Sequence, residues 1–475
     1  MQLFDFNTLK KDKAYFLLPI ILIMGFLLRV YNLGGSSLWF DELKTAGRID
    51  YPFILMLKDL AMSPFPPIYY ILMHFWVGIF GISEFSLRFP SLIFSLLTIV
   101  VIFKLTKKLF DKETALITAL LLALSPYNID YAREAKMYAM FWFFVILSFY
   151  YFYNFVRDNK TPYLIFYGIS SLASIYTIYA GFIFIIAQNI IFFLLFFDKR
   201  LIKKWLAVQA TIALFYLPWS NALAYSAFHA KEIGYGWISQ IINCKEFLFS
   251  LSMIIVNTRT APVMVNILLI CIYGFLFIYA LIHGGKNEHF LLLCIIIPIT
   301  VLYLTHSLIF PVFIVRYISF IHIPVLILCG RGINKGKKIK YALLMFLFCV
   351  TILYQLYPYY KSNVKIYVGP EDWRSLFAAI DQKKDRNSLI AAFSNKDGRA
   401  KYLYVTKGIK IYNKNEEIKL LIGKELMKNV LSEKYDSIFL VYFEKPDFNG
   451  SIDNYSIAEE HRMNRIGYLL FKKAM

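Results

Sequence analysis

Acidic side chains that could transfer a proton stand shortly after the first long apolar segment of the sequence. Asp41 and Glu42 are adjacent there, and Lys44 follows two residues later. A carboxylate is costly to hold beside hydrocarbon, so this pair indicates a site more than a solvated face. Such a carboxylate can accept the proton of an acceptor hydroxyl, and a nearby cation can stabilise developing negative charge. The simpler alternative is that both acids only cap a helix that starts here.

Further charged residues stand at the ends of other apolar segments. They are Asp130, Arg133, Glu134 and Lys136 with Tyr138 in one polar stretch, Arg88 before another apolar run, and Arg316-Tyr317 near a late one. Guanidinium and carboxylate groups at a membrane surface suit a reaction on an anionic lipid head group. The alternatives are an ion pair on a solvated loop helix for the polar stretch and head-group contact for Arg88 and Arg316.

Composition assigns the chain to the polytopic membrane proteins. Its 475 residues are 59% hydrophobic and 18% aromatic, well above the apolar fraction of soluble domains. The net charge of +20 lies mostly in short loops between apolar runs, where it sets orientation, so we exclude nucleic acid as a partner. The five cysteines have no Cys-x-x-Cys spacing, which gives no indication of a disulfide framework or a thiolate metal site.

Apolar runs long enough to cross a bilayer predict about eleven transmembrane helices, plus juxtamembrane helices. A shorter run opened by Pro66-Pro67 is interpreted as a helix lying in the interface, because the lysine-rich loops then all face one side. We therefore expect a cell (inner) membrane protein with a cytoplasmic N-terminus, an uncleaved first helix and an outward-facing Asp41. The predicted spans are 14–33, 86–108, 112–128, 136–156, 162–179, 180–197, 205–222, 263–283, 290–305, 312–330 and 340–358.

The composition changes after Tyr360 towards Lys, Asn, Asp and Glu with shorter apolar runs. We predict a transmembrane catalytic domain at 1–360 and a small external α/β domain at 361–475. An apolar piece at 247–256 could re-enter the membrane. Within the second domain, spacing predicts helices at 371–383 and 416–433 and strands at 388–393, 409–412, 437–443 and 468–472.

Several motifs occur in an order that resembles a known enzyme family. They are Asp41-Glu42 after the first span, Pro66-Pro67-Ile68-Tyr69-Tyr70, Glu84-Phe85-Ser86-Leu87-Arg88-Phe89-Pro90-Ser91, Ser125-Pro126 leading to Glu134-Ala135-Lys136-Met137-Tyr138, and Arg316-Tyr317, with Asp372-Trp373-Arg374 as a weaker match. The chain resembles the GT-C glycosyltransferases of the protein mannosyltransferase-like, family 39 branch, which includes aminoarabinose-transferase-like enzymes. The resemblance is densest over residues 14–160.

This resemblance implies an enzyme that transfers a sugar from a polyprenyl-phosphate carrier, with inversion, to an extracytoplasmic acceptor. The family's first acidic residue, which activates the acceptor, corresponds to Asp41, and its second-loop acid corresponds to Glu134. Lys136 replaces the arginine expected there and loses the planar fork for phosphate, which shifts phosphate binding towards Arg88 and Arg316. No cofactor is implied. A divalent cation is left open, because two loop carboxylates could bind one but no ligand spacing requires it.

Two other classes of function remain open at this stage. A transporter or flippase of a lipid-linked or anionic substrate would hold ionisable residues at mid-membrane in broken helices, whereas these charges stand at span ends. A scaffold would use its external domain to bind a partner and its loop charges only for orientation. The nature of the sugar and of the acceptor, whether protein, glycolipid or polysaccharide, does not follow from these residues.

Overall fold

The structure is a computed structural model with two compact units. One comprises residues 1–31, 53–75 and 88–366, and the other comprises residues 32–52, 76–87 and 367–475. The C-terminal residues are thus grouped with two early segments that lie between the first two predicted spans. The residues that the structure describes are 14–229, 252, 262–308, 315–336, 339–357, 360, 371–385, 387–394, 399–413, 419–422, 435–443, 455–463 and 465–473.

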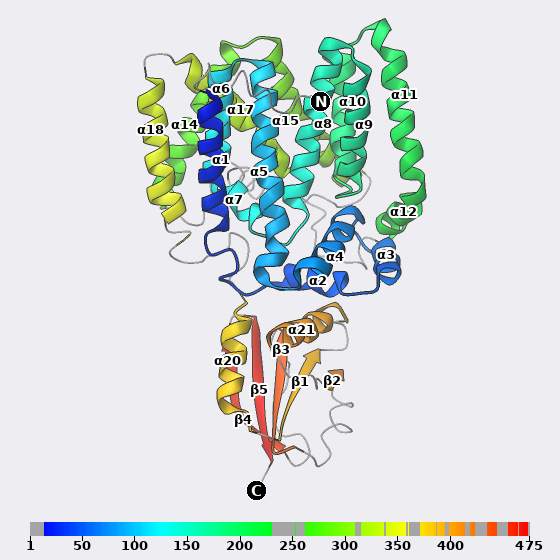
Figure 1. The fold of residues 1–475 in the computed structure, drawn as a ribbon, viewed down its shortest axis with the longest axis vertical. Coiled ribbons are helices and arrows are strands. Elements are labelled where there is room, and N and C mark those ends of the chain that lie inside the picture. The colour runs from blue at the N-terminus through cyan, green and yellow to red at the C-terminus, as the bar shows by residue number, and fades with distance from the viewer. Residues whose placement is uncertain are drawn as a thin grey trace. The chain divides into compact units, whose positions relative to one another are not determined.

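The first unit is a bundle of helices (Figure 1), whose members fall where apolar runs predict spans. Five helices in the described ranges are long and apolar enough to cross a membrane, or six if one bent pair counts as a span. The total of eleven stays a prediction. The matching helices are α1 (Ala14–Val30), α5 (Glu84–Leu109), α6 (Lys112–Leu124), α8 (Tyr138–Asp158), α9 (Thr161–Ile175), α10 (Gly181–Leu195), α11 (Lys199–Tyr216), α14 (Val263–Ile282), α15 (Lys286–Leu308), α17 (His322–Lys335) and α18 (Lys340–Val350).

The third predicted span, 112–128, is broken into two helices. Helix α6 ends at Leu124, and α7 (Pro126–Ala132) follows at an angle of 61°. Proline has no N–H to continue the hydrogen bonds of α6, but it is well suited to a first helical position. The Ser125 hydroxyl caps α7 by accepting a hydrogen bond from the Asn128 N–H at 3.2 Å. We call this bend the α6–α7 elbow.

The tenth predicted span is shifted along the chain. A short turn, α16 (Val315–Ile318), and a 3₁₀ turn, η4 (Ser319–Ile321), precede α17. Pro324 explains the late start, because a proline is tolerated in the first turn of a helix but disrupts its interior. The helix continues to Lys335, five residues beyond the predicted end. Its last turn is polar, so a search for apolar runs does not detect it. The apolar piece at 247–256 lies outside the described residues except for residue 252.

Helix α17 packs between α6 and α14. A Cβ at Gly332 would lie only 2.4 Å from the Leu276 carbonyl oxygen of α14, so this contact requires glycine. At one end of α6, Asp111 caps the helix and accepts a hydrogen bond from the Arg331 guanidinium at 2.9 Å. The same guanidinium donates to Glu288 at 3.3 Å. These pairs hold the ends of α6, α15 and α17 together.

Two short helices occupy the sequence between α2 (Phe40–Ile49) and α5. They are α3 (Phe53–Ala61) and α4 (Ile68–Phe80). With 13 residues, α4 is about 20 Å long at about 1.5 Å per residue, shorter than a hydrocarbon core of about 30 Å. Its position in the interface stays a prediction, because helices that match predicted spans, such as α6, are equally short. The ring of His74 in α4 packs 5.7 Å from the Phe53 ring.

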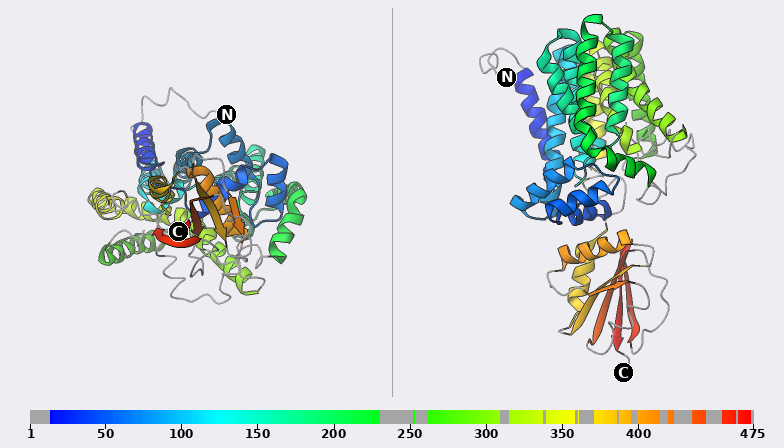
Figure 2. Two further views of the ribbon diagram at one scale, coloured as in Figure 1. Left: turned by 90° about the horizontal axis from the view of Figure 1, so that it is seen from below. Right: turned by 90° about the vertical axis from the view of Figure 1, so that its right-hand side faces the viewer.

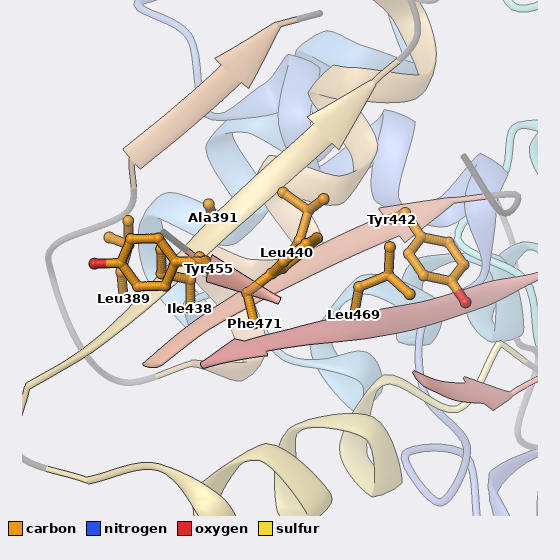
Figure 3. Packing of buried hydrophobic residues seen from close by; sticks show 8 residues of the cluster. All are labelled: Leu389, Ala391, Ile438, Leu440, Tyr442, Tyr455, Leu469 and Phe471. Carbon is orange, nitrogen blue, oxygen red and sulfur yellow. The ribbon is translucent and has the colours of Figure 1, made fainter. Parts of the chain in front are cut away.

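The second unit contains a five-stranded sheet with the order β2-β1-β3-β5-β4 (Figures 1 and 2). Strand β1 pairs in parallel with β2 and β3, and β5 pairs antiparallel with β3 and β4. One face carries a cluster of buried side chains that includes Leu440, Tyr442 and Phe471 (Figure 3). The elements are α20 (Trp373–Lys383), β1 (Ser388–Ser394), α21 (Arg399–Tyr412), β2 (Lys419–Ile422), β3 (Ser437–Phe443), β4 (Tyr455–Met463) and β5 (Ile466–Lys473).

Two local predictions in this unit are wrong. Residues 409–412 form the last turn of α21 and are no strand, because Val405, Ile409 and Tyr412 share one helix face, and the first two are fully buried. Residues 419–422, inside a predicted helix, form β2 and pair with β1. The remainder of that predicted helix lies outside the described residues. Strand β4, whose exposed face is polar, was absent from the prediction.

Candidate active site

The two adjacent carboxylates open a helix, α2 (Phe40–Ile49), and face different surroundings. Glu42 is fully buried, and its carboxylate accepts a hydrogen bond from the Trp39 N–H at 3.2 Å, as in the second half of a capping box. Asp41 is partly exposed, and its carbonyl accepts from Thr45 Oγ1 at 3.2 Å. The capping alternative therefore applies to Glu42, and Asp41 is the acid with solvent access.

Lys44 is directed towards its own helix. Its ammonium lies 4.7 Å from the centre of the Phe40 ring, and the Arg465 guanidinium lies 5.9 Å from the same ring. Cations over an aromatic face gain about 0.5–1 kcal/mol at exposed sites. This contact places positive charge beside the start of α2, one turn from Asp41.

The polar stretch after α7 is buried. Glu134 and Lys136 are each 2% exposed, and Asp130 is equally buried. The alternative of an ion pair on a solvated loop helix is therefore wrong for these residues. The Lys136 carbonyl accepts from Ser91 Oγ at 3.2 Å, and its ammonium lies 5.4 Å from the Phe65 ring centre. Charged groups are almost never fully buried unless they have partners.

Arg133 ties this stretch to the first helix. Its guanidinium donates to the Tyr31 carbonyl at 2.6 Å and lies 5.4 Å from the centre of the Tyr360 ring. The Tyr31 and Tyr360 rings meet edge to face at 5.6 Å. These contacts explain Arg133 as a link between α7 and the end of α1.

The structure brings Arg316 and Tyr138 together, although 178 residues separate them in the chain. The Arg316 guanidinium lies 5.8 Å from the centre of the Tyr138 ring. The Ser319 hydroxyl donates to the Arg316 carbonyl at 2.6 Å and accepts from Trp142 Nε1 at 2.9 Å. Arg316 and Tyr317 are both partly buried. The first turn of α8 therefore supports the arginine.

Arg88 is 1% exposed. Contact with lipid head groups is therefore the wrong explanation for this side chain, which lies inside the protein near the start of α5. Arg88, Glu134, Lys136 and Arg316 all belong to the first unit, whereas Asp41, Glu42 and Lys44 belong to the second. The convergence of these two sets stays a prediction.

Sequence inspection missed the arginine that organises the elbow. Arg29, in the last turn of α1, is completely buried, and all five of its N–H groups donate to neutral oxygens. An arginine inside an apolar run was the available signal. The acceptors are Ser95 Oγ at 2.8 Å, Gly25 O at 2.9 Å, Ala123 O at 3.0 Å, Leu122 O at 3.3 Å and Asn128 Oδ1 at 2.7 Å.

A histidine was also missed at the elbow. His322 Nε2 lies 2.8 Å from Ser125 Oγ, and its ring is 5.5 Å from the Tyr127 ring. The hydroxyl that caps α7 is thus bonded to the first residue of α17. Among the described residues, no group of three or more His, Cys, Asp or Glu side chains is arranged to hold a metal ion.

Comparisons with known proteins agree with this architecture. Residues 65–221 match the family model described as dolichyl-phosphate-mannose-protein mannosyltransferase. A protein of Aquifex aeolicus (strain VF5), described as uncharacterized, is 27% identical over 357 residues, which are 70% of this chain and 68% of that protein.

Solved structures extend the similarity to nearly the whole chain. ArnT from Cupriavidus metallidurans bound to undecaprenyl phosphate is similar with a TM-score of 0.61 and 12% identity, over 96% of this chain and 97% of that one. The apo oligosaccharyltransferase of Archaeoglobus fulgidus gives a TM-score of 0.54 and 13% identity over 84% of this chain. This chain spans 64% of the archaeal protein, less than two thirds of its length. The predictions of a multi-pass helical membrane protein and of a GT-C, mannosyltransferase-like fold are confirmed.

Proposed function

We propose that this chain, which has the fold of the GT-C membrane glycosyltransferases, transfers a sugar from a polyprenyl-phosphate carrier to an acceptor outside the cytoplasm, with inversion. The observation that supports the proposal most is the burial of charge after the elbow. Glu134 and Lys136 are each 2% exposed, at the end of a bent apolar helix. Holding charges of both signs away from water costs several kcal/mol each unless they have partners, so this stretch indicates a built polar site more than a solvated surface.

On the acceptor side, we assign Asp41 as the general base. Its carboxylate accepts the proton of the acceptor hydroxyl as the hydroxyl oxygen bonds to the anomeric carbon. The bond from that carbon to the phosphate oxygen breaks at the same time, and attack from the opposite face inverts the configuration. Glu42 supports Asp41 by closing the first turn of α2, and Glu134 is the second acid of the site.

On the donor side, the leaving polyprenyl phosphate gains negative charge that cations must stabilise. We assign this role to Arg316, Arg88 and Lys136. The Arg316 guanidinium is held over the Tyr138 ring, with Tyr317 as its neighbour. Lys44 and Arg133 have contacts within the protein, and we give them a secondary, electrostatic role.

We further propose a location in the inner membrane with a cytoplasmic N-terminus. The supporting pattern is the lysine- and arginine-rich loops, which fall on one side when α4 lies in the interface. The sheet of the second unit is then external, as are Asp41 and Glu134.

A transporter would use ionisable groups along a polar path through the bundle. Arg29 is the best candidate for such a group in the described helices. All five of its N–H groups are already bonded to protein oxygens, so it serves the fold and does not line a path. This observation favours transfer over transport.

The test is sugar transfer by the purified protein in lipid nanodiscs. Polyprenyl phosphates carrying hexosyl or pentosyl groups are offered with membrane glycolipid, polysaccharide or protein acceptors, and released polyprenyl phosphate is measured. Asp41→Asn should lower kcat by about 10²–10⁴-fold, the usual contribution of a general base. Glu42→Gln, which retains an oxygen acceptor for the Trp39 N–H, should lose far less.

Asp158→Asn is the matched control, because this aspartate pairs with Lys108 at 3.2 Å at the far end of α8. It should retain wild-type turnover. A folded Asp41→Asn protein with more than a tenth of wild-type kcat would refute the assignment of the base. Movement of the lipid across the membrane without any sugar transfer would favour the flippase instead.

A further inference from the structure

Both ends of the Asp41 helix are held by residues from the C-terminal part of the same compact unit. The chain enters α2 through Gly34-Gly35-Ser36-Ser37 and leaves it at Asp50. The entry is a tight turn in which the Asn32 side chain folds over Gly35, since a Cβ at Gly35 would lie 1.7 Å from Asn32 Oδ1. A glycine-rich turn holds the following helix in place only weakly unless other side chains bond to its backbone.

Arg374 supplies that support at the entry. One Nη group of its guanidinium donates to the Gly35 carbonyl at 3.1 Å. The other Nη group donates to the Gly34 carbonyl at 2.7 Å and to Glu84 Oε1 at 2.6 Å. The Arg374 backbone N–H also donates to Ser37 Oγ at 3.2 Å. The planar fork of arginine can reach adjacent carbonyls at once, which a lysine ammonium cannot do with the same geometry.

Tyr412 completes the same network from α21. Its hydroxyl accepts a hydrogen bond from the Leu38 N–H at 2.8 Å and donates to Glu84 Oε1 at 2.9 Å. Glu84 therefore receives one bond from Arg374 and one from Tyr412, and its side chain is only 13% exposed. The bonded Leu38 N–H lies three residues before Asp41.

The exit of the helix is held as well. The Lys407 ammonium, from α21, donates to Asp50 Oδ2 at 2.7 Å, and Lys407 is 8% exposed. Helices α2 and α21 also pack against each other. Residues of the C-terminal α/β fold thus form hydrogen bonds with the chain just before the first turn of α2 and just after its last turn.

We infer that Arg374, with Glu84 and Tyr412, is a positioning residue for Asp41. Through this network the C-terminal fold sets the place of the acceptor-activating carboxylate. The inference rests on the proposed function. It also gives a role to Asp372-Trp373-Arg374, since Asp372 caps α20 by accepting from the Ser375 N–H at 3.1 Å and so orients the arginine.

The loss of Arg374 should affect the position of Asp41 much more than the stability of the fold. The Arg374 side chain is 46% exposed, and the less exposed Glu84 keeps its hydrogen bond from Tyr412 when the arginine is removed, so the lost ion pair should cost about 1 kcal/mol. Removing it should leave the fold nearly intact. Catalysis is far more sensitive to geometry, because a displacement of about 1 Å at the reacting groups can cost about 10²-fold in rate.

The experiment measures kcat and KM for Arg374→Met, Arg374→Lys and Tyr412→Phe in the full-length protein in nanodiscs. Arg374→Met should lower kcat about 10–100-fold, while KM for the lipid donor changes by less than about threefold. Arg374→Lys should recover little of the loss, and Tyr412→Phe should show a smaller loss of the same kind. The melting temperature of each variant should stay within about 2 °C of wild type.

A double-mutant cycle with Asp41→Asn tests whether Arg374 acts through Asp41. If it does, Arg374→Met should cost nothing further in the Asp41→Asn background, because the group it positions is already gone. Lys473→Met, which removes an exposed cation from β5 of the same fold, is the matched control and should have wild-type kcat.

The outcomes separate the inference from the proposed function. An inactive Asp41→Asn protein together with a fully active Arg374→Met protein overturns the inference alone. Equal fractional losses from Arg374→Met in both backgrounds also overturn it, as does a large loss of melting temperature that accounts for the lost activity. A fully active Asp41→Asn protein overturns the proposed base, and the positioning role fails with it.

Discussion

Arg29 offers the sharpest test of how the bundle holds its elbow. The substitution Arg29→Met keeps a flexible, unbranched side chain but removes the charge and every donor. Four of the five hydrogen bonds run to other helices, and two of these end on the carbonyls of Leu122 and Ala123 in the last turn of α6. A third reaches Asn128 on α7 at 2.7 Å. The substitution therefore releases both sides of the elbow.

The magnitude follows from the number of bonds. Interhelical hydrogen bonds in membrane proteins average about 0.6 kcal/mol, with a maximum near 1.7 kcal/mol. Four such bonds give about 2.4 kcal/mol. The substitution also removes the desolvation cost of the buried guanidinium, which limits the total loss of stability. We expect Arg29→Met to destabilise the protein by about 2–3 kcal/mol, and Arg29→Lys by about half as much, because an ammonium has three donors on one atom.

The assay is thermal unfolding of the full-length protein in nanodiscs, together with turnover. At about 1–2 °C per kcal/mol for a chain of this size, Arg29→Met should lower the melting temperature by roughly 3–5 °C. Turnover should fall about tenfold, since the elbow sets the course of the chain into Glu134. Arg157→Met is the matched control, because Arg157 is exposed in the last turn of α8. A melting temperature within 1 °C of wild type for Arg29→Met, with full turnover, would refute the reasoning.

Two further predictions concern packing and pH. Gly332→Ala should destabilise the protein by about 1–3 kcal/mol, because its Cβ meets the Leu276 carbonyl of α14 at 2.4 Å and helices resist overpacking. Gly274→Ala, with open space around its Cβ, should show no such loss of melting temperature. The hydrogen bond from Lys383 lowers the pKa of Glu459, so its stabilisation is complete above the ordinary carboxyl pKa and disappears as pH falls through the lowered one. Glu459→Gln should therefore melt below wild type at pH 7, and the difference should shrink as the pH falls below the ordinary carboxyl pKa of about 4.3.

Much of the architecture was readable from the sequence because membrane helices depend on a local property. A helix in hydrocarbon satisfies its own backbone, so an apolar run of sufficient length predicts it without knowledge of its neighbours. The runs at 86–108 and 136–156 correspond closely to α5 and α8. The sheet was harder, since β2 forms by pairing with the distant strand β1, and the residues of β2 and β4 carry weak signals of their own.

The roles of individual charged residues depended on contacts that sequence spacing does not contain. Asp41 and Glu42 are adjacent acids that the sequence does not tell apart. In the structure Glu42 caps α2, whereas Asp41 keeps solvent access. Arg88 and Arg316 stand alike at the ends of apolar runs, yet one is buried and the other rests on Tyr138.

The sequence by itself determined that this is a helical membrane protein, which acidic and basic residues stand at the ends of its spans, and which family it resembles. Only the tertiary structure decided that Arg29 joins α1 to the elbow and that Arg374 and Tyr412 meet on Glu84. The physical reason is range. Hydropathy acts residue by residue along the chain, whereas a hydrogen bond between residues about 300 apart exists only once the fold has brought its donor and acceptor together.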